Sequence, residues 1–573
     1  MTTVGTRAAT GGELVVETLK ALGTRFVFGV PGGQTLAITD AILSTPEMRF
    51  VTVRHEGAAA CMADAVGRLT GLPGICLATT GPGATNLLTG VGGAFRDSSP
   101  VLVLTCNNNL RDLARDDAQA ADHVEIFRSL TKWATLVPEA QMIPQVLEEA
   151  FLRAASGCPG PVLVDFARSA LESSIEVASS APEPHPALAL VAQRPLGDPG
   201  RVRAAAELLR SSRRPVMWLG NGVNRSHAGV EALKLAERIE MPVITTFNGI
   251  GAVPTTNSLV FGPLSRMGTE LSTRVISDAD LVLVIGNSLN AISTSRWSLE
   301  LPRTVIQIDI EPANLGRYYA PRTVGILGDA RAVLDQLDLA VSQTEPDPAA
   351  AAERHARLDE LLDARAGWLE RASEARYGSD SKLIPPDRLV RVVREVSPDE
   401  TLLIVDAGNP GVWSYLWEIR RPGTYLKPVG FGNMGFALPA AIGAGLARPG
   451  VPLVALTGDG SLGMTLGELE TLAREEVPVC IVVMNDAGYG NIRQEQLVKY
   501  GPRTIGVDFA DVDYAAVARA CGVEAVRAST EDELREAVAD ALGRPRPFLV
   551  DARIDPDLNV WTYPLFQQYE VGD

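Results

Sequence analysis

Short apolar runs that alternate with small-residue stretches restrict what this chain can fold into. Residues 26–30, 74–78 and 101–105 are apolar runs of strand length, which is typical of strands buried on both faces of a parallel sheet. The stretches between such runs have the helical pattern that crossover connections between parallel strands require. The pattern predicts an α/β protein built from doubly wound parallel sheets.

Two breaks in this pattern divide the chain into three domains. At 573 residues the chain is too long for a single ordinary core. A stretch rich in Pro, Ala and Ser interrupts the pattern near residues 181–194, and a polar segment with one charged helix interrupts it at 343–379. We therefore expect domains at residues 1–180, 195–342 and 380–560, followed by a tail at 561–573.

The composition argues against several classes of partner. The formal net charge is −17 and no Lys/Arg-rich run is present, so nucleic acid and anionic membranes would be repelled. No apolar run has the length of a membrane span or a signal sequence. The 6 cysteines and 5 histidines lack the spacing of zinc ligands, so a metal site would be built from oxygen atoms. We expect a cytoplasmic protein with no nucleic-acid or membrane partner.

Two acidic residues directly follow predicted strands. Gly458-Asp459-Gly460-Ser461 comes after the strand predicted at 451–457, and Asn485-Asp486 after the strand predicted at 479–484. In a doubly wound sheet the carboxyl ends of the strands line the ligand crevice, so Asp459 and Asp486 are expected to meet there as oxygen ligands. Neighbouring glycines would let backbone amides approach phosphate oxygens. The motifs favour a Mg²⁺–diphosphate site, although each alone also fits a tight turn after a strand.

The spacing of these motifs resembles the signature of thiamine diphosphate-dependent enzymes, in which GDG is followed at a similar distance by Asn or Asp. Here 27 residues separate Asp459 from Asp486. Arg54-His55-Glu56, at a predicted strand end, resembles the activating-glutamate motif of the same family. The resemblance implies that Glu56 holds a proton on the cofactor's aminopyrimidine ring, which then removes the thiazolium C2 proton. The alternative for Glu56 is a solvated acid at a helix start.

A third match is the segment from Gly430 to Gly435, which precedes a predicted helix at 436–447. As a GxGxxG pattern with Asp459 24 residues after Gly435, it imitates a dinucleotide fingerprint. The resemblance implies instead that Met434 lies beneath the bent cofactor and that Gly432 offers its carbonyl to the aminopyrimidine; the alternative for Met434 is ordinary core packing. The implied cofactor contacts are Glu56, Asn409, Gly432, Met434, Gly458, Asp459, Gly460, Ser461, Asp486, Gly488, Tyr489, Gly490 and Asn491, with Asp459, Asp486 and Gly488 as metal ligands.

Four stretches extend the resemblance to the acetolactate synthase large-subunit branch of this family. They are residues 28–33, 54–56 and 80–86, and Gln119 placed 13 residues before Lys132. The resemblance implies that Gln119, the Gly33 backbone and Gln34 orient the reacting carbonyl. A polar residue at position 34 is also similar to benzaldehyde-lyase-like members, and the alternative for Gln119 is a surface helix residue. The three domains then correspond to a pyrimidine-binding, a central and a diphosphate-binding domain.

The chain departs from that branch at several positions. Gln494-Glu495 stands where acetolactate synthases typically carry Gln-Trp, and Ala118 stands in place of their phenylalanine, which leaves the acceptor open. Arg493 is a candidate to bind a substrate carboxylate, or an exposed helical arginine. Residues 220–222 and 308–311 partly resemble FAD-binding segments, but the flavin-contacting arginine is missing from 286–290. The sequence therefore argues against FAD and leaves it open.

These patterns predict an Mg²⁺- and thiamine diphosphate-dependent enzyme that decarboxylates a 2-oxo acid such as pyruvate and joins the remaining carbons to a second carbonyl compound. The alternatives are a 2-oxo acid decarboxylase or acyloin lyase, a flavin-dependent oxidase, and a subunit without turnover. Because the family places Glu56 of one subunit opposite the diphosphate site of another, we expect a homodimer or homotetramer with a shared active site.

Overall fold

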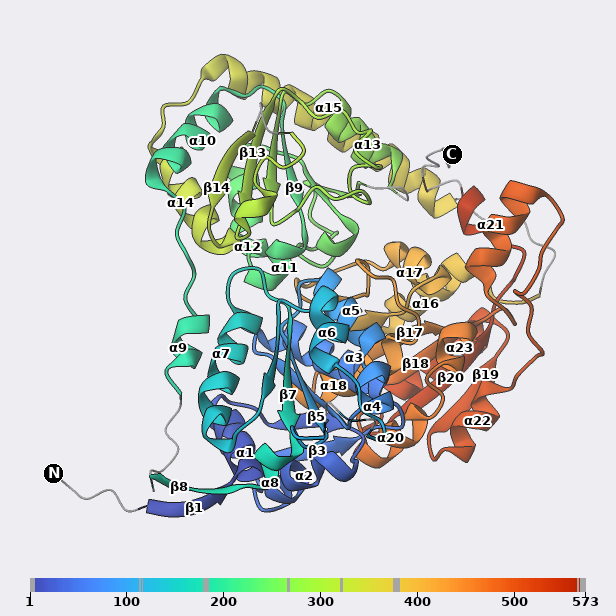
Figure 1. Cartoon of the computed structure of the whole chain (residues 1–573). Coiled ribbons are helices and arrows are strands. Elements are labelled where there is room, and N and C mark those ends of the chain that lie inside the picture. The colour runs from blue at the N-terminus through green and yellow to red at the C-terminus, as the bar shows by residue number, and fades with distance from the viewer. Residues whose placement is uncertain are drawn as a thin grey trace.

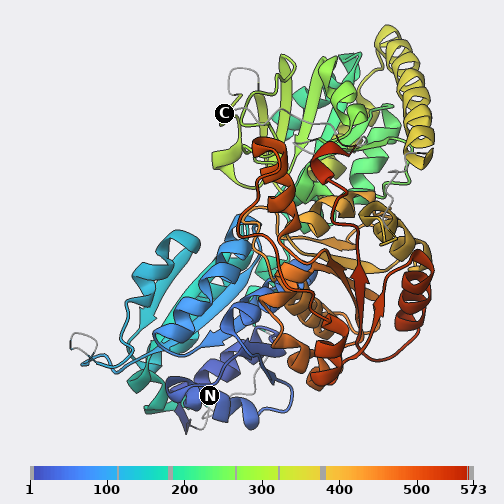
Figure 2. The same ribbon diagram turned by 90° about the vertical axis from the view of Figure 1, so that its right-hand side faces the viewer.

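Three six-stranded sheets form the framework of the molecule. The computed structural model describes residues 6–112, 115, 117–178, 185–264, 268–319, 323–374, 382–563 and 566. Every strand pair within the three sheets is parallel. Helices pack around each sheet, and the three layered units touch one another (Figures 1 and 2). The prediction of three doubly wound α/β units is confirmed.

The N-terminal sheet, blue in Figure 1, has the strand order β3-β2-β4-β5-β7-β6. Its strands are β2 (Phe26–Gly29), β3 (Arg49–Thr52), β4 (Gly74–Ala78), β5 (Val101–Asn107), β6 (Trp133–Val137) and β7 (Pro161–Ala167). Its helices are α1 (Gly11–Ala21), α2 (Leu36–Leu43), α3 (Glu56–Thr70), α4 (Pro82–Asn86), α5 (Leu88–Arg96), α6 (His123–Phe127), α7 (Ile143–Ala155) and α8 (Arg168–Glu172). A separate antiparallel pair, β1 (Thr6–Thr10) with β8 (Ser174–Ala178), was not predicted from the sequence.

The central sheet, green in Figure 1, has the order β11-β10-β9-β12-β13-β14. Its strands are β9 (Pro215–Leu219), β10 (Val243–Thr245), β11 (Val260–Pro263), β12 (Leu281–Ile285), β13 (Thr304–Asp309) and β14 (Thr323–Leu327). Its helices are α10 (Pro199–Ser211), α11 (Asn221–Ser226), α12 (Gly229–Arg238), α13 (Glu270–Ser277) and α14 (Ala330–Gln343), and α9 (Ala187–Val191) precedes them. The charged helix expected in the second linker is α15 (Pro348–Glu374), which buries Leu358 and Leu361 against the central unit.

The C-terminal sheet, orange to red, has the order β16-β15-β17-β18-β20-β19. Its strands are β15 (Leu402–Val405), β16 (Tyr425–Leu426), β17 (Leu453–Gly458), β18 (Cys480–Asn485), β19 (Glu524–Ala528) and β20 (Phe548–Arg553). Its helices are α16 (Pro386–Val396), α17 (Asn409–Trp413), α18 (Ala437–Ala447), α19 (Asp459–Gly463), α20 (Glu468–Glu475), α21 (Gly490–Tyr500), α22 (Tyr514–Ala520) and α23 (Glu531–Leu542).

Each sheet reverses its strand order at a place inside the sheet, and the loops at the carboxyl ends of the strands there form a crevice. The reversal falls between β2 and β4 in the first sheet, between β9 and β12 in the second, and between β15 and β17 in the third. The loops after β2 and β4 carry Gln34 and residues 79–83, and the loops after β15 and β17 carry Asn409 and Asp459. The topology therefore puts the predicted site residues at two of the three crevices.

Helices α3 and α18 bring the N-terminal and C-terminal units together. Both helices are rich in alanine and glycine and are mostly buried. A side chain at Gly443 would come within 2.5 Å of the Met62 carbonyl oxygen and 2.8 Å of its Cα. The helices thus meet backbone to backbone, and their residues form one core with both sheets.

Lys427, just after β16, sits at the contact between the central and C-terminal units. Its ammonium donates hydrogen bonds to the Gly411 carbonyl at 2.6 Å and to the Tyr415 hydroxyl at 3.1 Å. It also lies 5.3 Å from the ring centroid of Phe247, which stacks on Tyr415. Burial lowers the pKa of Lys427 from its ordinary value of 10.5 to about 7, although Asp97 acts in the opposite direction.

This shift predicts a pH-dependent stability. Below about pH 7 both the folded and the unfolded chain carry the charge, whereas between about 7 and 10.5 only the unfolded chain keeps the proton, so stability rises with pH across this window. In Lys427→Met that contribution is gone. We expect the unfolding temperature of the variant, relative to wild type, to fall steadily as the pH is raised from about 7 to about 10. A difference that does not change with pH in thermal scans would contradict this prediction.

In the part of the chain that the structure describes, every helix falls short of the length and apolar character needed to cross a membrane.

Candidate active site

Gln34 ties together the loops that follow β2, β4 and β5. It lies in the 3-10 helix η1 (Gly33–Thr35). Its Oε1 accepts a hydrogen bond from Thr79 Oγ1 at 2.7 Å, and its Nε2 donates one to Asn108 Oδ1 at 3.1 Å. A side chain built at Gly33 would meet no atom within 4 Å, so this backbone borders open space. Gln34 therefore braces the crevice, while the Gly33 backbone is accessible from it.

Gln119 lies in a turn, not in a helix, beside the loop that follows β4. Its φ is 61°, in the left-handed region that residues other than glycine seldom adopt. Its carbonyl accepts a hydrogen bond from Thr80 Oγ1 at 3.2 Å, and a side chain at Gly81 would come within 2.5 Å of the same oxygen. The side chain of Gln119 is exposed. The structure thus brings Gln119 to the loop that also contacts Gln34.

Glu56 is the first residue of α3 and is only 8% exposed. The side chain of His55 caps this helix by accepting the Gly57 N–H at 3.0 Å. Asn86 Nδ2 donates to Glu56 Oε2 at 2.9 Å, and Oε1 lies 3.3 Å from the position that a Gly83 side chain would take. The alternative of a solvated acid does not fit this burial. Asn86 is the last residue of the stretch 80–86, and sequence reasoning did not predict its contact with Glu56.

A buried network beneath the β4 loop was missed by sequence reasoning. The Gly81 N–H donates to His123 Nε2 at 3.0 Å, so the ring proton is on Nδ1, which contacts Asp165 Oδ1 at 2.9 Å. Thr105 and Asn107 also donate to the Asp165 carboxylate, at 2.7 and 2.9 Å. These residues are far apart in sequence and carry no motif. They hold in place the loop that positions Asn86 and Glu56.

Asp459 and Asp486 are joined through the loop that follows β18. Asp459 begins α19 and is 2% exposed. Its Oδ1 accepts the Gly460 N–H at 3.0 Å, and its Oδ2 accepts the Gly488 N–H at 2.9 Å. Asp486 follows β18 and is 8% exposed. The side chain of Ser461, in the same short helix, is also buried.

Both carboxyls of this pair have raised pKa values. Burial and the neighbouring Asp486 raise the pKa of Asp459 to about 7. Burial raises the pKa of Asp486 to about 6, although Arg493 acts in the opposite direction. Arg493 forms an ion pair with Asp486 Oδ2 at 2.9 Å, and its side chain is 13% exposed. It is therefore not an exposed arginine, and its guanidinium already has a carboxylate partner within the chain. Two buried carboxylates are too few for a complete cage, and a hard cation here would also need backbone and phosphate oxygens.

The described residues contain no cluster of three or more His, Cys, Asp or Glu side chains suited to a metal. The loop 486–490 is held close: a side chain at Gly490 would collide with Asp486 Oδ2, and one at Gly460 would come within 2.8 Å of the Tyr489 ring. Glycine is therefore required at both positions for the two loops to meet.

Asn409 and Asn491 connect the loops after β15 and β18. Asn491 Nδ2 donates to Asn409 Oδ1 at 2.9 Å, and Asn409 Nδ2 lies 3.4 Å from Gln494 Oε1. Gln494 also holds the C-terminal segment, since its Nε2 donates to the Leu558 carbonyl at 2.9 Å and its Oε1 accepts the Val560 N–H at 3.1 Å. The segment near residue 560 thus covers this side of the site.

The segment from Gly430 to Gly435 reaches the same crevice. Gly432 has a φ of 69°, and a side chain there would meet no atom within 4 Å. Met434 is half-buried, and its Cε lies 3.5 Å from where a Gly460 side chain would be, next to the Tyr489 ring. Asp406, which sequence reasoning missed, accepts the N–H groups of Phe436 and Ala437 at 3.2 and 3.1 Å and so holds the start of α18.

The predicted residues therefore form two groups. Glu56, Gly33, Gln34 and Gln119 lie at the crevice of the N-terminal sheet, and the diphosphate and metal candidates lie at the crevice of the C-terminal sheet. The hydrogen bond to the Glu56 side chain comes from Asn86, whereas those to Asp459 come from Gly460 and Gly488.

The third crevice opens into a cavity of about 540 Å³ between the three units. It is lined by residues of α3, α5 and the segment before Gly432, and by the loops after β9 and β12, from which Asn221, Gly286, Asn287, Ser288 and Asn290 come. Asp309 also lines it, and burial raises the pKa of this carboxyl to about 6. The position expected for a flavin-contacting arginine is filled by uncharged residues.

Two glycine-rich crevices, one with a buried acidic pair and one with a buried glutamate at a helix start, define a class of α/β enzymes that bind a diphosphate cofactor. Family models agree. The thiamine pyrophosphate enzyme N-terminal TPP binding domain matches residues 9–126, the central domain matches 202–337, and the C-terminal TPP binding domain matches 406–552. The chain belongs to the thiamine pyrophosphate-dependent enzyme family.

Its curated relatives include acetolactate synthases. The chain is 32% identical to the probable acetolactate synthase large subunit of Methanocaldococcus jannaschii, over 95% of this chain and 92% of the relative. It is 32% identical to the acetolactate synthase isozyme 3 large subunit of Escherichia coli K12, over 97% and 96%. A probable chloroplastic acetolactate synthase 2 of Oryza sativa is also 32% identical, over 94% and 82%. The resemblance to this branch is confirmed.

Proposed function

We propose that this protein is a thiamine diphosphate- and Mg²⁺-dependent carboligase that acts like acetolactate synthase, decarboxylating a 2-oxo acid such as pyruvate and joining the product to a second carbonyl compound. The observation that carries the proposal is the pair of buried carboxylates, Asp459 and Asp486, at the crevice of the C-terminal sheet, where Asp459 also accepts the Gly488 N–H. The relatives named acetolactate synthase support the choice of reaction.

Thiamine diphosphate supplies, when bound, a nucleophilic carbon and an electron sink. Asp459, Asp486 and the carbonyl of Gly488 are proposed to hold Mg²⁺, and the glycines around them to admit the diphosphate. Asn409, Ser461, Tyr489, Gly490 and Asn491 complete the proposed contacts at this end. The raised pKa of both carboxyls supports a cation here, because a divalent ion would stabilise their charged forms.

Glu56 is proposed to exchange a proton with the aminopyrimidine ring. Its Oε2 already accepts from Asn86, so Oε1, which faces Gly83, is the oxygen for this transfer. A carboxylate held in one orientation by a neutral donor is well suited to general acid–base work. Gln119 and the Gly33 amide are proposed to orient the reacting carbonyl, while Gln34 fixes the loops that carry them.

We propose that the reaction runs without FAD. Residues 286–290 follow β12, and four of these five residues line the central cavity; the stretch contains no arginine for the flavin. This also disfavours the flavin-dependent oxidase. A purified protein with flavin absorbance and peroxide formation from a 2-oxo acid would instead favour the oxidase.

We propose a homodimer or homotetramer in the cytoplasm, with each active site built from two subunits. Within the chain, the side chains of Glu56 and Asp459 share no hydrogen-bond partner among the described residues. Three apolar side chains beside the cofactor crevice are exposed in the single chain: Phe431 at 48%, Met464 at 55% and Ile492 at 49%. Exposed apolar side chains gathered at a site are typical of a surface that a partner covers. The buried free thiols of Cys61, Cys76, Cys106 and Cys480 suit a reducing compartment.

A mixing experiment tests the shared site. Glu56→Gln and Asp459→Asn would each inactivate both sites of their own homodimer. In a mixed dimer one site combines the intact Glu56 of one subunit with the intact Asp459 of the other. We expect random reassortment of the two inactive proteins to restore about a quarter of wild-type activity, since half the dimers are mixed and each has one intact site. No recovery after verified subunit exchange would mean that both groups act within one chain.

Product analysis tests the reaction. The protein is incubated with pyruvate, thiamine diphosphate and Mg²⁺, and products are identified by mass spectrometry and NMR beside a Glu56→Gln control. We expect acetolactate or another ligated product that the control does not form. Acetaldehyde alone would favour the decarboxylase, and an absence of turnover across a panel of 2-oxo acids and aldehydes, with cofactor bound, would favour a subunit without turnover.

A further inference from the structure

The segment that carries Gly432 and Met434 is fixed by a residue outside both crevices. Asp97 caps the C-terminal end of α5 and its side chain is fully buried. Its Oδ1 accepts the Gly430 N–H at 2.7 Å, and its Oδ2 accepts the Val429 N–H at 3.1 Å. One carboxylate therefore binds two consecutive backbone amides, two residues before Gly432.

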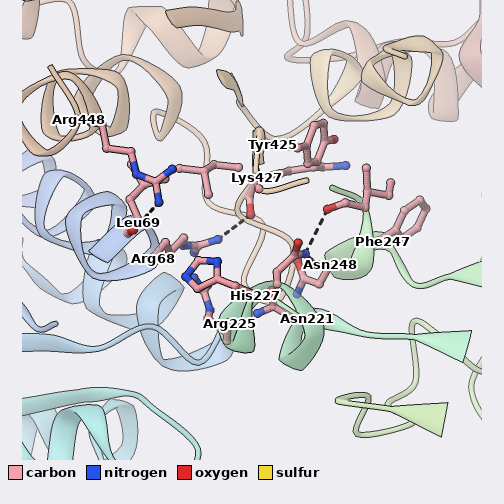
Figure 3. A pocket seen from close by; sticks show the side chains of 14 residues that line it. Arg68, Leu69, Asn221, Arg225, His227, Phe247, Asn248, Tyr425, Lys427 and Arg448 are labelled. Atoms are coloured by element: carbon pink, nitrogen blue, oxygen red, sulfur yellow. Dashed lines mark hydrogen bonds between the residues drawn. The ribbon is translucent and has the colours of Figure 1, made fainter. Parts of the chain in front are cut away.

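A second group holds the same stretch of backbone from the other side. Arg68 NH1 donates to the Lys427 carbonyl at 2.9 Å, and Arg68 NH2 pairs with Asp97 Oδ2 at 3.0 Å and with Asp64 Oδ2 at 2.6 Å. Figure 3 shows Arg68, from α3, directed at the backbone of Lys427, where the three units meet. The ion pair thus holds residues 427–430 in two ways: Arg68 donates to the Lys427 carbonyl, and Asp97 accepts the N–H groups of residues 429 and 430.

Helix α5 is shaped to receive the rest of the segment. A side chain at Gly430 would come within 2.6 Å of the Arg96 carbonyl, so this backbone rests directly on the helix end. A side chain at Gly92 would come within 2.9 Å of the Phe431 ring, and one at Gly93 within 2.8 Å of Asn433 Oδ1. Alternate residues of the segment therefore sit over glycines of α5.

We propose that Asp97 is a positioning residue for the aminopyrimidine half of the cofactor: by holding the amides of Val429 and Gly430 it sets where Gly432 and Met434 lie. The proposal rests on the cofactor role proposed above for those two residues. It predicts a selective defect. The diphosphate half is held by Asp459 and Asp486 on other loops, so loss of the Asp97 carboxylate affects binding of the ring and not of the diphosphate.

The test is Asp97→Asn in the full-length protein. The amide keeps the size of the carboxylate but presents an NH₂ group to donors that require an acceptor. Calorimetric titrations with Mg²⁺ present measure the affinity for thiamine diphosphate and, separately, for inorganic diphosphate. We expect the first affinity to fall about tenfold to a hundredfold and the second to change by less than about twofold.

Asp64→Asn is the matched control. It makes the same substitution on the other carboxylate that pairs with Arg68, and Asp64 is as buried as Asp97, at 1% exposure. Its carboxylate contacts Arg68 rather than the 429–430 amides. Arg68 keeps its pairing with Asp97, and its NH1 bond to the Lys427 carbonyl does not involve Asp64. We therefore expect a similar loss of thermal stability but both affinities within about twofold of wild type.

Three results would overturn the positioning role: an unchanged thiamine diphosphate affinity in Asp97→Asn, an equal loss for both ligands, or the same selective loss in Asp64→Asn. If Asp97→Asn does not fold, Gly430→Ala serves instead, because its side chain would push the segment off Arg96 and Asp97 while keeping the ion pair, and the same selective loss is expected. A wild-type protein that binds inorganic diphosphate but not thiamine diphosphate would refute the proposed function itself.

Discussion

Replacing Glu56 by glutamine is expected to lower turnover by about 10²- to 10⁴-fold, the range of a lost general acid–base catalyst. The amide retains an oxygen that can accept from Asn86, now 2.9 Å from Oε2, so the helix start should keep its structure. What is lost is the proton that Oε1 exchanges with the cofactor ring. We expect thiamine diphosphate still to bind, while exchange of its C2 proton for deuterium, followed by NMR after rapid quenching, becomes slow.

Glu468→Gln provides the control for this experiment. Glu468 is a buried glutamate whose Oε1 accepts the N–H groups of Arg54 and His55, at 3.0 and 3.1 Å, directly before Glu56. Glutamine can keep both hydrogen bonds, so turnover and C2 exchange should remain within a few fold of wild type. Equal losses in both variants, or rapid C2 exchange in Glu56→Gln, would rule out the proton-transfer role.

Asp459→Asn is expected to abolish Mg²⁺-dependent cofactor binding while sparing the fold. Losing the charged partner of a buried cation costs about 3–5 kcal/mol, which corresponds to about 10²- to 4 × 10³-fold in affinity. Because burial and Asp486 raise the pKa of Asp459 to about 7, its charge destabilises the protein when no cation is bound. Asparagine can accept only one of the Gly460 and Gly488 N–H groups, which offsets the gain from removing the charge. We therefore expect the unfolding temperature of the variant without cofactor to lie close to that of wild type.

Asp508→Asn is the matched substitution at the edge of the same site. Asp508 pairs with Arg493 at 3.3 Å, but its side chain is 67% exposed. Exposed pairs contribute little, so calorimetry should give nearly wild-type affinities for Mg²⁺ and thiamine diphosphate. If Asp459→Asn kept its affinity, the metal role would be wrong, and if it lost stability as well as binding, the residue would be structural.

The fold could be predicted from the sequence because its signals are local. The continuous apolar run 74–78 became β4 with the same bounds, and the runs 26–30 and 101–105 became β2 and β5 with ends shifted by one or two residues, since parallel strands buried on both faces leave little choice of residue. The β1–β8 pair gave no such signal. It is half-exposed, short and antiparallel, and it joins residues that are distant in sequence.

The site divides in the same way. Asp459 and Asp486 could be predicted because each follows a strand, and topology brings the ends of parallel strands together. The residues that hold the site loops in place could not be predicted. His123 and Asp165, like Asp97 and Gly430, are far apart in sequence and meet only through tertiary contacts. Gln34 shows the limit of a motif, since the sequence suggested a group facing substrate and the structure engages both ends of its amide within the protein.

The contact of α3 with α18 has a consequence for how such an enzyme can change. Where Gly443 meets Met62 there is no room for even one methyl group. Because the packing is this close, side-chain substitutions at the contact cannot make small adjustments to the angle between the two helices. The close contact of the two helices therefore fixes the distance between the N-terminal and C-terminal sheets. New substrate preferences would then have to evolve through residues outside this pair, such as Ala118 in a turn and Glu495 in α21, and directed-evolution libraries should be concentrated there.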